Sequence, residues 1–216
     1  MKVDGENMLD NVFVFCQSAI KITSSKNIYF DPYLIKDNLN DADVIFITHE
    51  HYDHFDLESI NKVKKDDTLI VVPNSMLNKV LSLFDQNEIL GVDPDKEYSI
   101  FDFKVKVVRA YNNNKKFHPK ENNWVGYILY LDNNSYYIMG DSDDTLDARE
   151  VKCDYLFVPI GGVYTMNGIE GATLTNVIKP KCVIPIHYKT VVGSELELNN
   201  FLNNLDNNIQ NKIYIK

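Results

Sequence analysis

The stretch THEHYDHFD, residues 48–56, holds three of the five histidines in the chain and places them beside Asp53. Imidazole and carboxylate groups are the ligands that zinc and other first-row cations favour in proteins. On an extended or turning backbone, residues 49, 51 and 53 share one side and residue 54 is displaced around the bend, so that two neighbouring pockets can be filled. Structural histidines have no reason to cluster with an aspartate at this spacing, and the stretch therefore predicts a metal site.

Three further residues extend the candidate ligand set. His118 and His187 complete the histidines of the chain, and Asp141 follows an apolar segment in Gly140-Asp141-Ser142. Paired metals about 3.5–4 Å apart can clamp the attacking and leaving oxygens of a hydrolysis, and about six or seven side-chain ligands suit such a pair. Each of these residues also has a simpler interpretation, because a lone histidine is usually a hydrogen-bonded bystander and Gly-Asp-Ser is ordinary turn chemistry.

An ordered set of short motifs runs along most of the chain. The run HEHYDH matches the pattern HxHxDH, and it is accompanied by Gln17-Ser18-Ala19-Ile20, Tyr29-Phe30-Asp31-Pro32, Ala110-Tyr111-Asn112, His118-Pro119-Lys120, Val125-Gly126-Tyr127, Gly140-Asp141-Ser142, Gly161-Gly162-Val163-Tyr164-Thr165-Met166, Lys179-Pro180-Lys181 and Ile184-Pro185-Ile186-His187-Tyr188. From about residue 12 onward the chain resembles the metallo-β-lactamase superfamily, and within it the small single-domain branch similar to ascorbate-6-phosphate lactonase.

The resemblance implies a site with two divalent metal ions, zinc first, with manganese or iron as alternatives that accept the same donors. It assigns the first ion to His49, His51 and a third histidine, and the second ion to Asp53, His54 and His187. Asp141 would be the bridging carboxylate, and Asp31 would orient a ligand imidazole. The superfamily usually places the third histidine at the end of a mid-chain strand, where this sequence has Ala110-Tyr111-Asn112. His118, a few residues further on, is the candidate for that position.

The same resemblance implies a metal-dependent hydrolase. Metal-bound water has its pKa lowered towards about 7, which supplies hydroxide, and Asp53 and Asp141 would hold and orient it. The expected substrate is a small phosphorylated lactone, a cyclic ester or a phosphodiester. A nuclease acting on RNA or DNA ends and a non-catalytic metal-binding protein are the alternatives. The sequence lacks a Gly-x-Ser-x-Gly elbow, a Walker loop and a dinucleotide fingerprint, which argues against serine hydrolysis, phosphotransfer and hydride transfer.

Composition and charge narrow the class of protein and its partners. With 216 residues and 44% hydrophobic content, residues 1–216 are expected to form a single hydrolase domain. The net charge of −9 argues against a nucleic-acid partner, whereas bound cations and local lysines at 115, 116, 120 and 189 would still accommodate a small anionic substrate. Three cysteines without CxxC spacing, in a sequence without a signal peptide, fit a cytoplasmic protein. No apolar run is long enough to span a membrane, and the oligomeric state stays open.

The hydrophobic pattern alternates short strands with helices in two halves, which predicts an α/β fold, and the resemblance implies a four-layer αβ/βα sandwich. Aromatic side chains expected along the groove are Tyr111, Trp124, Tyr164 and Tyr188, and the helix caps expected are Asp56, Ser75 and Ser194. Strands are predicted at residues 12–22, 27–31, 43–48, 68–72, 98–108, 125–131, 135–139, 154–158 and 182–187, and helices at 56–64, 75–84, 168–178 and 194–205.

Overall fold

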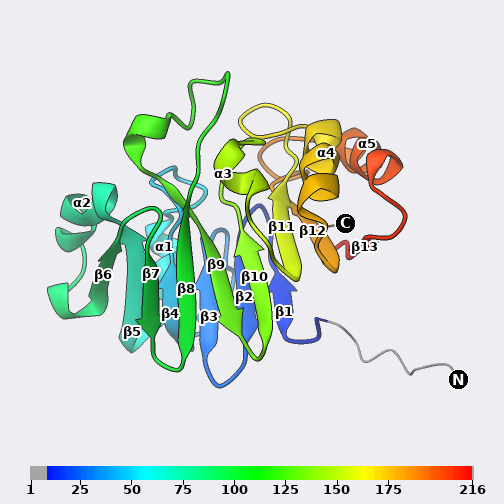
Figure 1. Ribbon diagram of the computed structural model, residues 1–216. Helices are drawn as coiled ribbons and strands as arrows, with labels where there is room; N and C mark the ends of the chain where they lie inside the picture. The colour runs from blue at the N-terminus through cyan, green and yellow to red at the C-terminus, as the bar shows by residue number, and fades with distance from the viewer. Residues whose placement is uncertain (1–8, 216) are drawn as a thin grey trace, which may run out of the picture.

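Two β-sheets lie face to face in the computed structural model, which describes residues 9–215 (Figure 1). The first sheet has six strands in the order β1 (Val12–Val14), β2 (Ile20–Thr23), β3 (Asn27–Phe30), β4 (Ala42–Phe46), β5 (Lys64–Pro73) and β6 (Ile89–Val92). The second has seven in the order β13 (Gln210–Asn211), β12 (Cys182–Ile186), β11 (Tyr155–Pro159), β10 (Asn134–Ile138), β9 (Val125–Leu131), β8 (Phe103–Arg109) and β7 (Glu97–Ile100).

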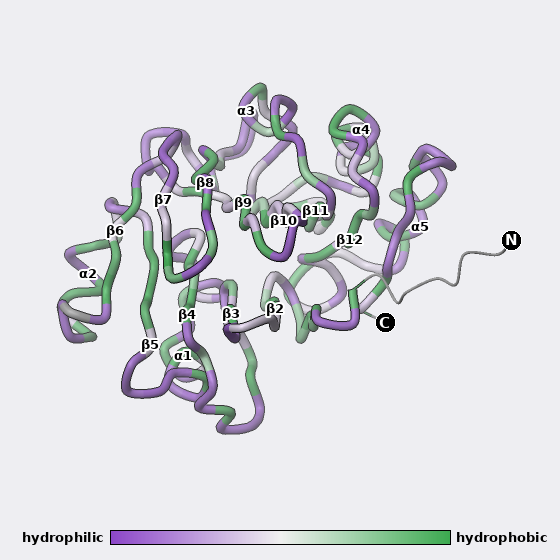
Figure 2. Tube along the Cα trace, turned by 60° about the horizontal axis from the view of Figure 1, so that its bottom comes forward, coloured by the Kyte–Doolittle hydropathy of each residue, from purple (hydrophilic) through white to green (hydrophobic). Residues whose placement is uncertain are grey.

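Helices cover the outer face of each sheet. One apolar cluster joins the first sheet to α1 (Leu57–Val63) and α2 (Leu77–Leu81), and another joins the second sheet to α3 (Leu146–Arg149), α4 (Gly168–Ile178) and α5 (Glu195–Asn204). Figure 2 shows the first pair of helices on one side of the strands and the other three on the opposite side. The result is the predicted four-layer αβ/βα sandwich of the metallo-β-lactamase type. Short 3-10 turns complete the described elements: η1 (Asn74–Met76), η2 (Gln86–Glu88) and η3 (Lys120–Asn122).

A third apolar cluster fills the space between the sheets. Side chains alternate along β8, so that Phe103, Val105 and Val107 are buried between the sheets while the lysines between them are exposed. Across the interface, the ring of Phe46 at the end of β4 lies 4.9 Å from that of Tyr127 in β9. The Tyr127 hydroxyl donates a 2.7 Å hydrogen bond to the carbonyl of Ile47. These contacts fix the end of β4 immediately before the histidine-rich stretch.

The edge of the sandwich that carries the candidate ligands follows from strand direction. Strands β3 to β6 run parallel in the first sheet, and β10 to β13 run parallel in the second. The carboxyl ends of parallel strands meet at one edge, and loops at that edge commonly carry functional residues. Here the histidine-rich stretch follows β4, Asp141 follows β10, and His187 follows β12.

Two predicted strands are each divided in the structure. The predicted strand at 12–22 is β1 and β2, joined by a turn in which Ala19 donates its backbone N–H to the carbonyl of Cys16. The predicted strand at 98–108 is the hairpin β7 and β8, which reverses at Phe101, a residue with φ +50°. Neither turn contains the Gly or Pro that usually marks such a reversal. The apolar pattern of the sequence therefore runs through each turn without a break, and one strand was predicted in place of two. Strands β6 and β13 and helix α3 were not predicted.

Helix positions agree more closely with the prediction. Asp56 accepts from the backbone N–H of Ser59 and caps α1, and the Ser194 side chain caps α5 through Leu196. Ser75 is wrong as a cap, because it lies inside the 3-10 turn that precedes α2. Within residues 9–215, none of the helices combines the length and the apolar character that crossing a bilayer requires.

Candidate metal centre

The backbone turns sharply inside the histidine-rich stretch. The backbone N–H groups of His54 and Phe55 both donate to the carbonyl of His51, at 3.0 and 2.8 Å. This turn sends His49 and His51 into one cluster and Asp53 and His54 into another. The expectation that residue 53 shares a side with residues 49 and 51 is therefore wrong, because the chain does not stay extended beyond His51.

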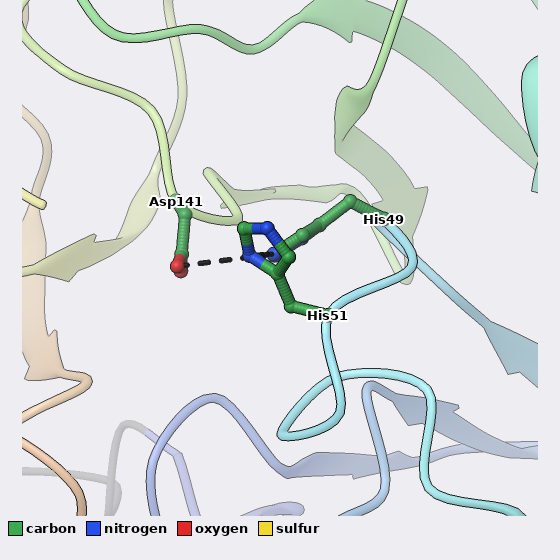
Figure 3. Close-up of side chains that lie close together, drawn as sticks. All are labelled: His49, His51 and Asp141. Atoms are coloured by element: carbon green, nitrogen blue, oxygen red, sulfur yellow. Dashed lines mark hydrogen bonds and ion pairs between the residues drawn. The ribbon is translucent and has the colours of Figure 1, made fainter. Parts of the chain in front are cut away.

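The first cluster consists of His49, His51 and Asp141, whose ligand atoms all lie within 4.8 Å of one another. The Nε2 atom of His49 is 2.9 Å from Nδ1 of His51 and 3.8 Å from Oδ2 of Asp141. Figure 3 shows the two rings and the carboxylate converging from opposite sides, the histidines from the loop after β4 and the aspartate from the loop after β10. The first cluster therefore joins the two sheets.

The second cluster consists of Asp53, His54 and His187, with the same convergence of ligand atoms. The Nε2 atom of His187 is 3.4 Å from Oδ2 of Asp53, and Nε2 of His54 is 3.9 Å from the same oxygen. The rings of His54 and His187 stack with centroids 5.4 Å apart. His187 adopts a left-handed backbone with φ +58°, which is uncommon for a residue other than glycine.

Asp141 lies between the two clusters. While its Oδ2 faces His49, its Oδ1 is 3.1 Å from Nε2 of His54 and 3.3 Å from Nε2 of His187. Burial alone would raise the pKa of the Asp141 carboxyl, but the neighbouring charges of His187 and His54 hold the pKa well below its usual range. The preceding Gly140 has φ +59°, and a Cβ there would lie 3.0 Å from that of Thr48. The position of the carboxylate thus depends on a backbone that glycine adopts without strain.

His118 is brought beside the first cluster although it lies in a different loop. Its ring is fully buried, with its centroid 4.6 Å from that of His49. Its carbonyl accepts a 2.7 Å hydrogen bond from the backbone of Asn112, which folds the segment between β8 and β9 back on itself. Burial lowers the pKa of His118 to about 3, so the ring is neutral, which is the form that binds metals. Neither ring nitrogen has a hydrogen-bond partner among the described residues.

Asp31 and Thr48 orient two of the histidine rings. Asp31 Oδ2 is 2.8 Å from Nδ1 of His54, and Thr48 donates to the same carboxylate through its hydroxyl and its backbone N–H. The Thr48 hydroxyl is also 2.9 Å from Nδ1 of His49. With the Nδ1 atoms engaged in this way, the Nε2 atoms of His54 and His49 face the clusters. Such outer partners fix the tautomer of a ligand imidazole.

Gln17 has a role at the centre that was not predicted. Its buried amide donates to Asp53 Oδ2 at 3.2 Å and lies 3.3 Å from Nε2 of His187, and its Oε1 accepts from the backbone N–H of Val191. The Gln17 carbonyl accepts from the His187 backbone as well. A single glutamine after the first strand carries no signal of its own, since its partners lie between 36 and 174 positions away in the sequence.

Several buried donor atoms support a site for cations. Both ring nitrogens of His118 and Nδ1 of His187 have no hydrogen-bond partner among the described residues, and His54 Nε2 and Asp141 Oδ1 lie 3.1 Å apart without the geometry of a hydrogen bond. Buried polar atoms in proteins are nearly always hydrogen-bonded, so an exception needs an explanation. Neutral imidazole nitrogens and carboxylate oxygens are the donor set of divalent zinc and similar ions. The residues therefore fit the metal ions that the sequence predicted.

A cavity of about 230 Å³ opens beside the clusters, and its lining differs from the prediction. Of the four aromatic residues expected there, Tyr164 alone lines it, while Trp124 packs against the rings of His49, His51 and His118. The hydroxyls of Tyr188 and Tyr111 are bonded elsewhere, to the Ile215 carbonyl and to Asp147. The full lining is His51, Tyr52, Asp53, Phe117, Asp141, Tyr164 and Val191.

Three of the four lysines expected to help bind an anionic substrate lie beside carboxylates, whereas the fourth, Lys116, is exposed. Lys115 lies 2.5 Å from Asp143, Lys189 lies 2.5 Å from Glu195, and Lys120 packs over the ring of Tyr111 with Asp147 at 4.0 Å. These side chains were expected to be available to a substrate carboxylate or phosphate. Instead, their charge is balanced by acidic side chains of the same chain.

Comparison with known proteins identifies relatives of the chain. The beta-lactamase superfamily domain matches residues 16–187. A UPF0173 metal-dependent hydrolase of Lysinibacillus sphaericus is 31% identical over 191 residues, which is 80% of this chain and 82% of the relative. A second, from Pyrococcus furiosus, is 30% identical over 189 residues, with 80% and 82% covered.

Solved structures of other proteins share the fold of this chain. A protein of Parabacteroides distasonis superimposes with a TM-score of 0.80 and 25% identity, over 95% of this chain and 93% of the other. A metallo hydrolase of Ignicoccus hospitalis, at 19% identity and a TM-score of 0.74 over 94% and 93% of the two chains, shares the fold. None of these four proteins is named for a substrate, and they give no support to the narrower resemblance to ascorbate-6-phosphate lactonase.

Proposed function

Because the chain belongs to the UPF0173 metal-dependent hydrolases of the metallo-β-lactamase superfamily, we propose that it hydrolyses a small anionic ester at the paired histidine and aspartate clusters. The substrate classes are a phosphorylated lactone, a cyclic ester and a phosphodiester. The observation that carries the proposal is the position of Asp141, whose two carboxylate oxygens face different clusters. An arrangement of this kind suits two cations acting on one substrate oxygen.

The ligand assignment divides seven residues between two ions. His49, His51 and His118 would hold the first divalent ion, and Asp53, His54 and His187 the second, with Asp141 shared between them. Zinc is the first choice, and manganese and iron accept the same donors. The buried donor atoms without partners support this assignment.

The chemistry supplied by two divalent cations when bound is a lowered pKa of water, towards about 7, and polarisation of the oxygen under attack. The protein residues position the reactants. Asp53 and Asp141 would accept hydrogen bonds from the attacking water and hold it against the substrate. Gln17 holds Asp53 by its amide, and Asp31 and Thr48 keep the ring nitrogens of His54 and His49 pointing inward. Trp124 closes the side of the first cluster away from the cavity and excludes solvent there.

The substrate charge would be met by the cations, because Lys115 and Lys189 are already paired and no lysine among the described residues lines the cavity. This arrangement also disfavours nucleic acid, whose backbone needs several unpaired basic side chains. A small substrate is further supported by the size of the cavity, since about 230 Å³ is below the roughly 300–1,000 Å³ typical of sites for drug-sized ligands.

The test combines metal analysis with a substrate panel. Protein prepared without added metal is analysed for zinc, manganese and iron, and the metal-replete protein is assayed on bis-aryl phosphodiester, lactone and thioester substrates. We expect turnover of the phosphodiester or the lactone, and a loss of at least about 100-fold in His51→Ala and Asp141→Asn, since even outer partners of metal ligands contribute 10–100-fold.

Asp154→Asn is the matched control, because Asp154 binds Ser135 and Lys181 outside the centre. Metal-replete protein that is inert on every substrate class would overturn the proposed function. Full activity in His51→Ala or Asp141→Asn would overturn the ligand assignment.

A further inference from the structure

The cavity beside the clusters has two chemically different walls. One wall consists of His51, Asp53 and Asp141, which belong to the clusters. The other consists of Tyr52, Phe117, Tyr164 and Val191, which come from separate loops. A ligand that fills this cavity therefore touches both the cluster residues and a group of aromatic and apolar side chains.

The aromatic side chains of the second wall are arranged around the opening. The rings of Phe117 and Tyr164 meet edge to face, with centroids 4.7 Å apart. Phe117 is 46% exposed, Tyr164 36% and Tyr52 65%, although large apolar surfaces are costly to leave in water. Exposed apolar side chains that gather around a concave site mark places where ligands bind.

The apolar wall carries no basic side chain. None of the residues that line the cavity, within the part of the chain that the structure describes, is lysine or arginine. Lys115 and Lys189, which each precede a wall residue by two positions, are paired with Asp143 and Glu195, and Lys116, directly before Phe117, is exposed and does not line the cavity. A second anionic group at this end of a substrate would find no basic side chain among the described residues of the cavity lining to compensate its desolvation.

The volume of the cavity limits the group that it receives. A cavity of about 150 Å³ in another protein binds benzene. The present cavity, at about 230 Å³, is large enough for one ring of that size together with the reacting group. A bicyclic group or a sugar phosphate would extend beyond it.

We propose that this cavity binds a single uncharged, apolar ring that is attached directly to the ester group undergoing hydrolysis. The inference rests on the proposed function and narrows it to cyclic esters and phosphodiesters whose remaining substituent is a ring such as phenyl. Phe117, Tyr164, Tyr52 and Val191 determine the specificity by contacting the ring, and the cluster residues receive the anionic end.

Two phosphonates that share the anionic group test the proposal. Phenylphosphonate and methylphosphonate are titrated into the zinc-loaded protein, and their affinities are measured by calorimetry and as inhibition constants. Full burial of a side chain the size of a phenyl ring contributes about 1.5–3 kcal/mol, which corresponds to about 10- to 150-fold in affinity. We expect phenylphosphonate to bind more tightly by a factor in this range.

Variants of the apolar wall separate ring binding from anion binding. Phe117→Ala should reduce the preference for phenylphosphonate about fivefold or more while leaving the affinity for methylphosphonate unchanged, and Phe117→Leu should retain most of the preference. Phe101→Ala is the matched control, because Phe101 is similarly exposed, at 57%, and does not line the cavity. Circular dichroism confirms that each variant is folded.

The outcomes distinguish the two proposals. Equal affinity for the two phosphonates, in protein that binds zinc and hydrolyses an ester, would overturn the ring site and leave the hydrolase intact. The ring site is also overturned if Phe117→Ala keeps the preference for phenylphosphonate as fully as the control Phe101→Ala does. If neither phosphonate binds in a zinc-dependent manner, the proposed function fails and the ring site fails with it.

Discussion

Replacement of Asp31 by asparagine tests how the second cluster is oriented. Asp31 Oδ2 lies 2.8 Å from Nδ1 of His54, and Asp31 Oδ1 accepts the backbone N–H of Thr48 at 2.8 Å. An ionised carboxylate only accepts hydrogen bonds, so Nδ1 of His54 carries the ring proton. Burial alone would lower the pKa of His54, but the carboxylates of Asp141 and Asp31 raise it well above its usual value, so a cation bound at Nε2, which faces Asp141 at 3.1 Å, would take the place of the second ring proton.

Asparagine cannot reproduce both contacts of Asp31. If its amide oxygen remains on Thr48, its NH₂ group faces His54, and the ring proton is forced onto Nε2, the atom assigned to the metal. If the amide flips, its NH₂ group meets the Thr48 N–H, and a buried donor loses its acceptor. Leaving such a group unsatisfied costs about 1–3 kcal/mol, which equals about 5- to 150-fold in affinity. We expect zinc binding at the second cluster to weaken by a factor in this range.

Competition with a chromophoric chelator measures the zinc affinity, and thermal unfolding in the presence of chelator measures stability without metal. Asp43→Asn is the control, because Asp43 also accepts a backbone N–H, from Asn27 at 2.8 Å in the same sheet, but its side chain binds lysines instead of histidine. The tautomer argument is refuted if Asp31→Asn binds two zinc ions as tightly as Asp43→Asn and the unaltered protein.

Three further predictions concern separate features. His118→Ala should reduce zinc bound per chain at limiting metal concentration, and an unaltered stoichiometry measured by mass spectrometry of the metal would assign the third position elsewhere. Gly140→Ala should lower the melting temperature by about 2–8 °C, because a left-handed backbone costs alanine about 1–2 kcal/mol, and should also weaken zinc binding by displacing Asp141. Gly162→Ala, at φ +83° with its nearest contact at 3.4 Å, should cost stability alone, and equal zinc affinities in the two variants would contradict this. Burial raises the pKa of Cys153 to about 12, so only about one-thousandth of this thiol is ionised at pH 9. Because the thiolate is the reactive form, iodoacetamide should label Cys153 slowly in the native protein and rapidly in urea.

The strands and helices could be predicted because their patterns are local, whereas their arrangement in four layers was implied by the family resemblance. Apolar runs of strand length and the amphipathic segments at 168–178 and 194–205 are each determined by neighbouring residues, and both helices are found within a residue of the predicted bounds. The hairpin at Phe101 was missed because the reversal uses a left-handed residue other than glycine, which leaves no mark in the sequence. Strand β13 has two residues, too few for an alternating pattern to be visible.

The candidate site also has a part that could be predicted from the sequence and a part that could not. The stretch around His49 and His51 could be recognised because its donors are adjacent in sequence. The role of Asp31 beside His54 was implied by the family resemblance, whereas the contact of Gln17 with Asp53 depends on segments that come together only in the folded chain. The lining of the cavity could not be predicted, because only the folded chain brings an aromatic residue such as Phe117 next to the other lining residues.

The origin of the ligands on both sheets has a consequence for biosynthesis. His49 and His51 leave the ribosome early, and Asp141 and His187 follow much later. A cation captured by the nascent histidines alone would be held weakly and could be exchanged with competing ligands in the cell. On the proposed ligand assignment, the choice of metal would be made only after the C-terminal strands have docked, when the ligands from both sheets are in place.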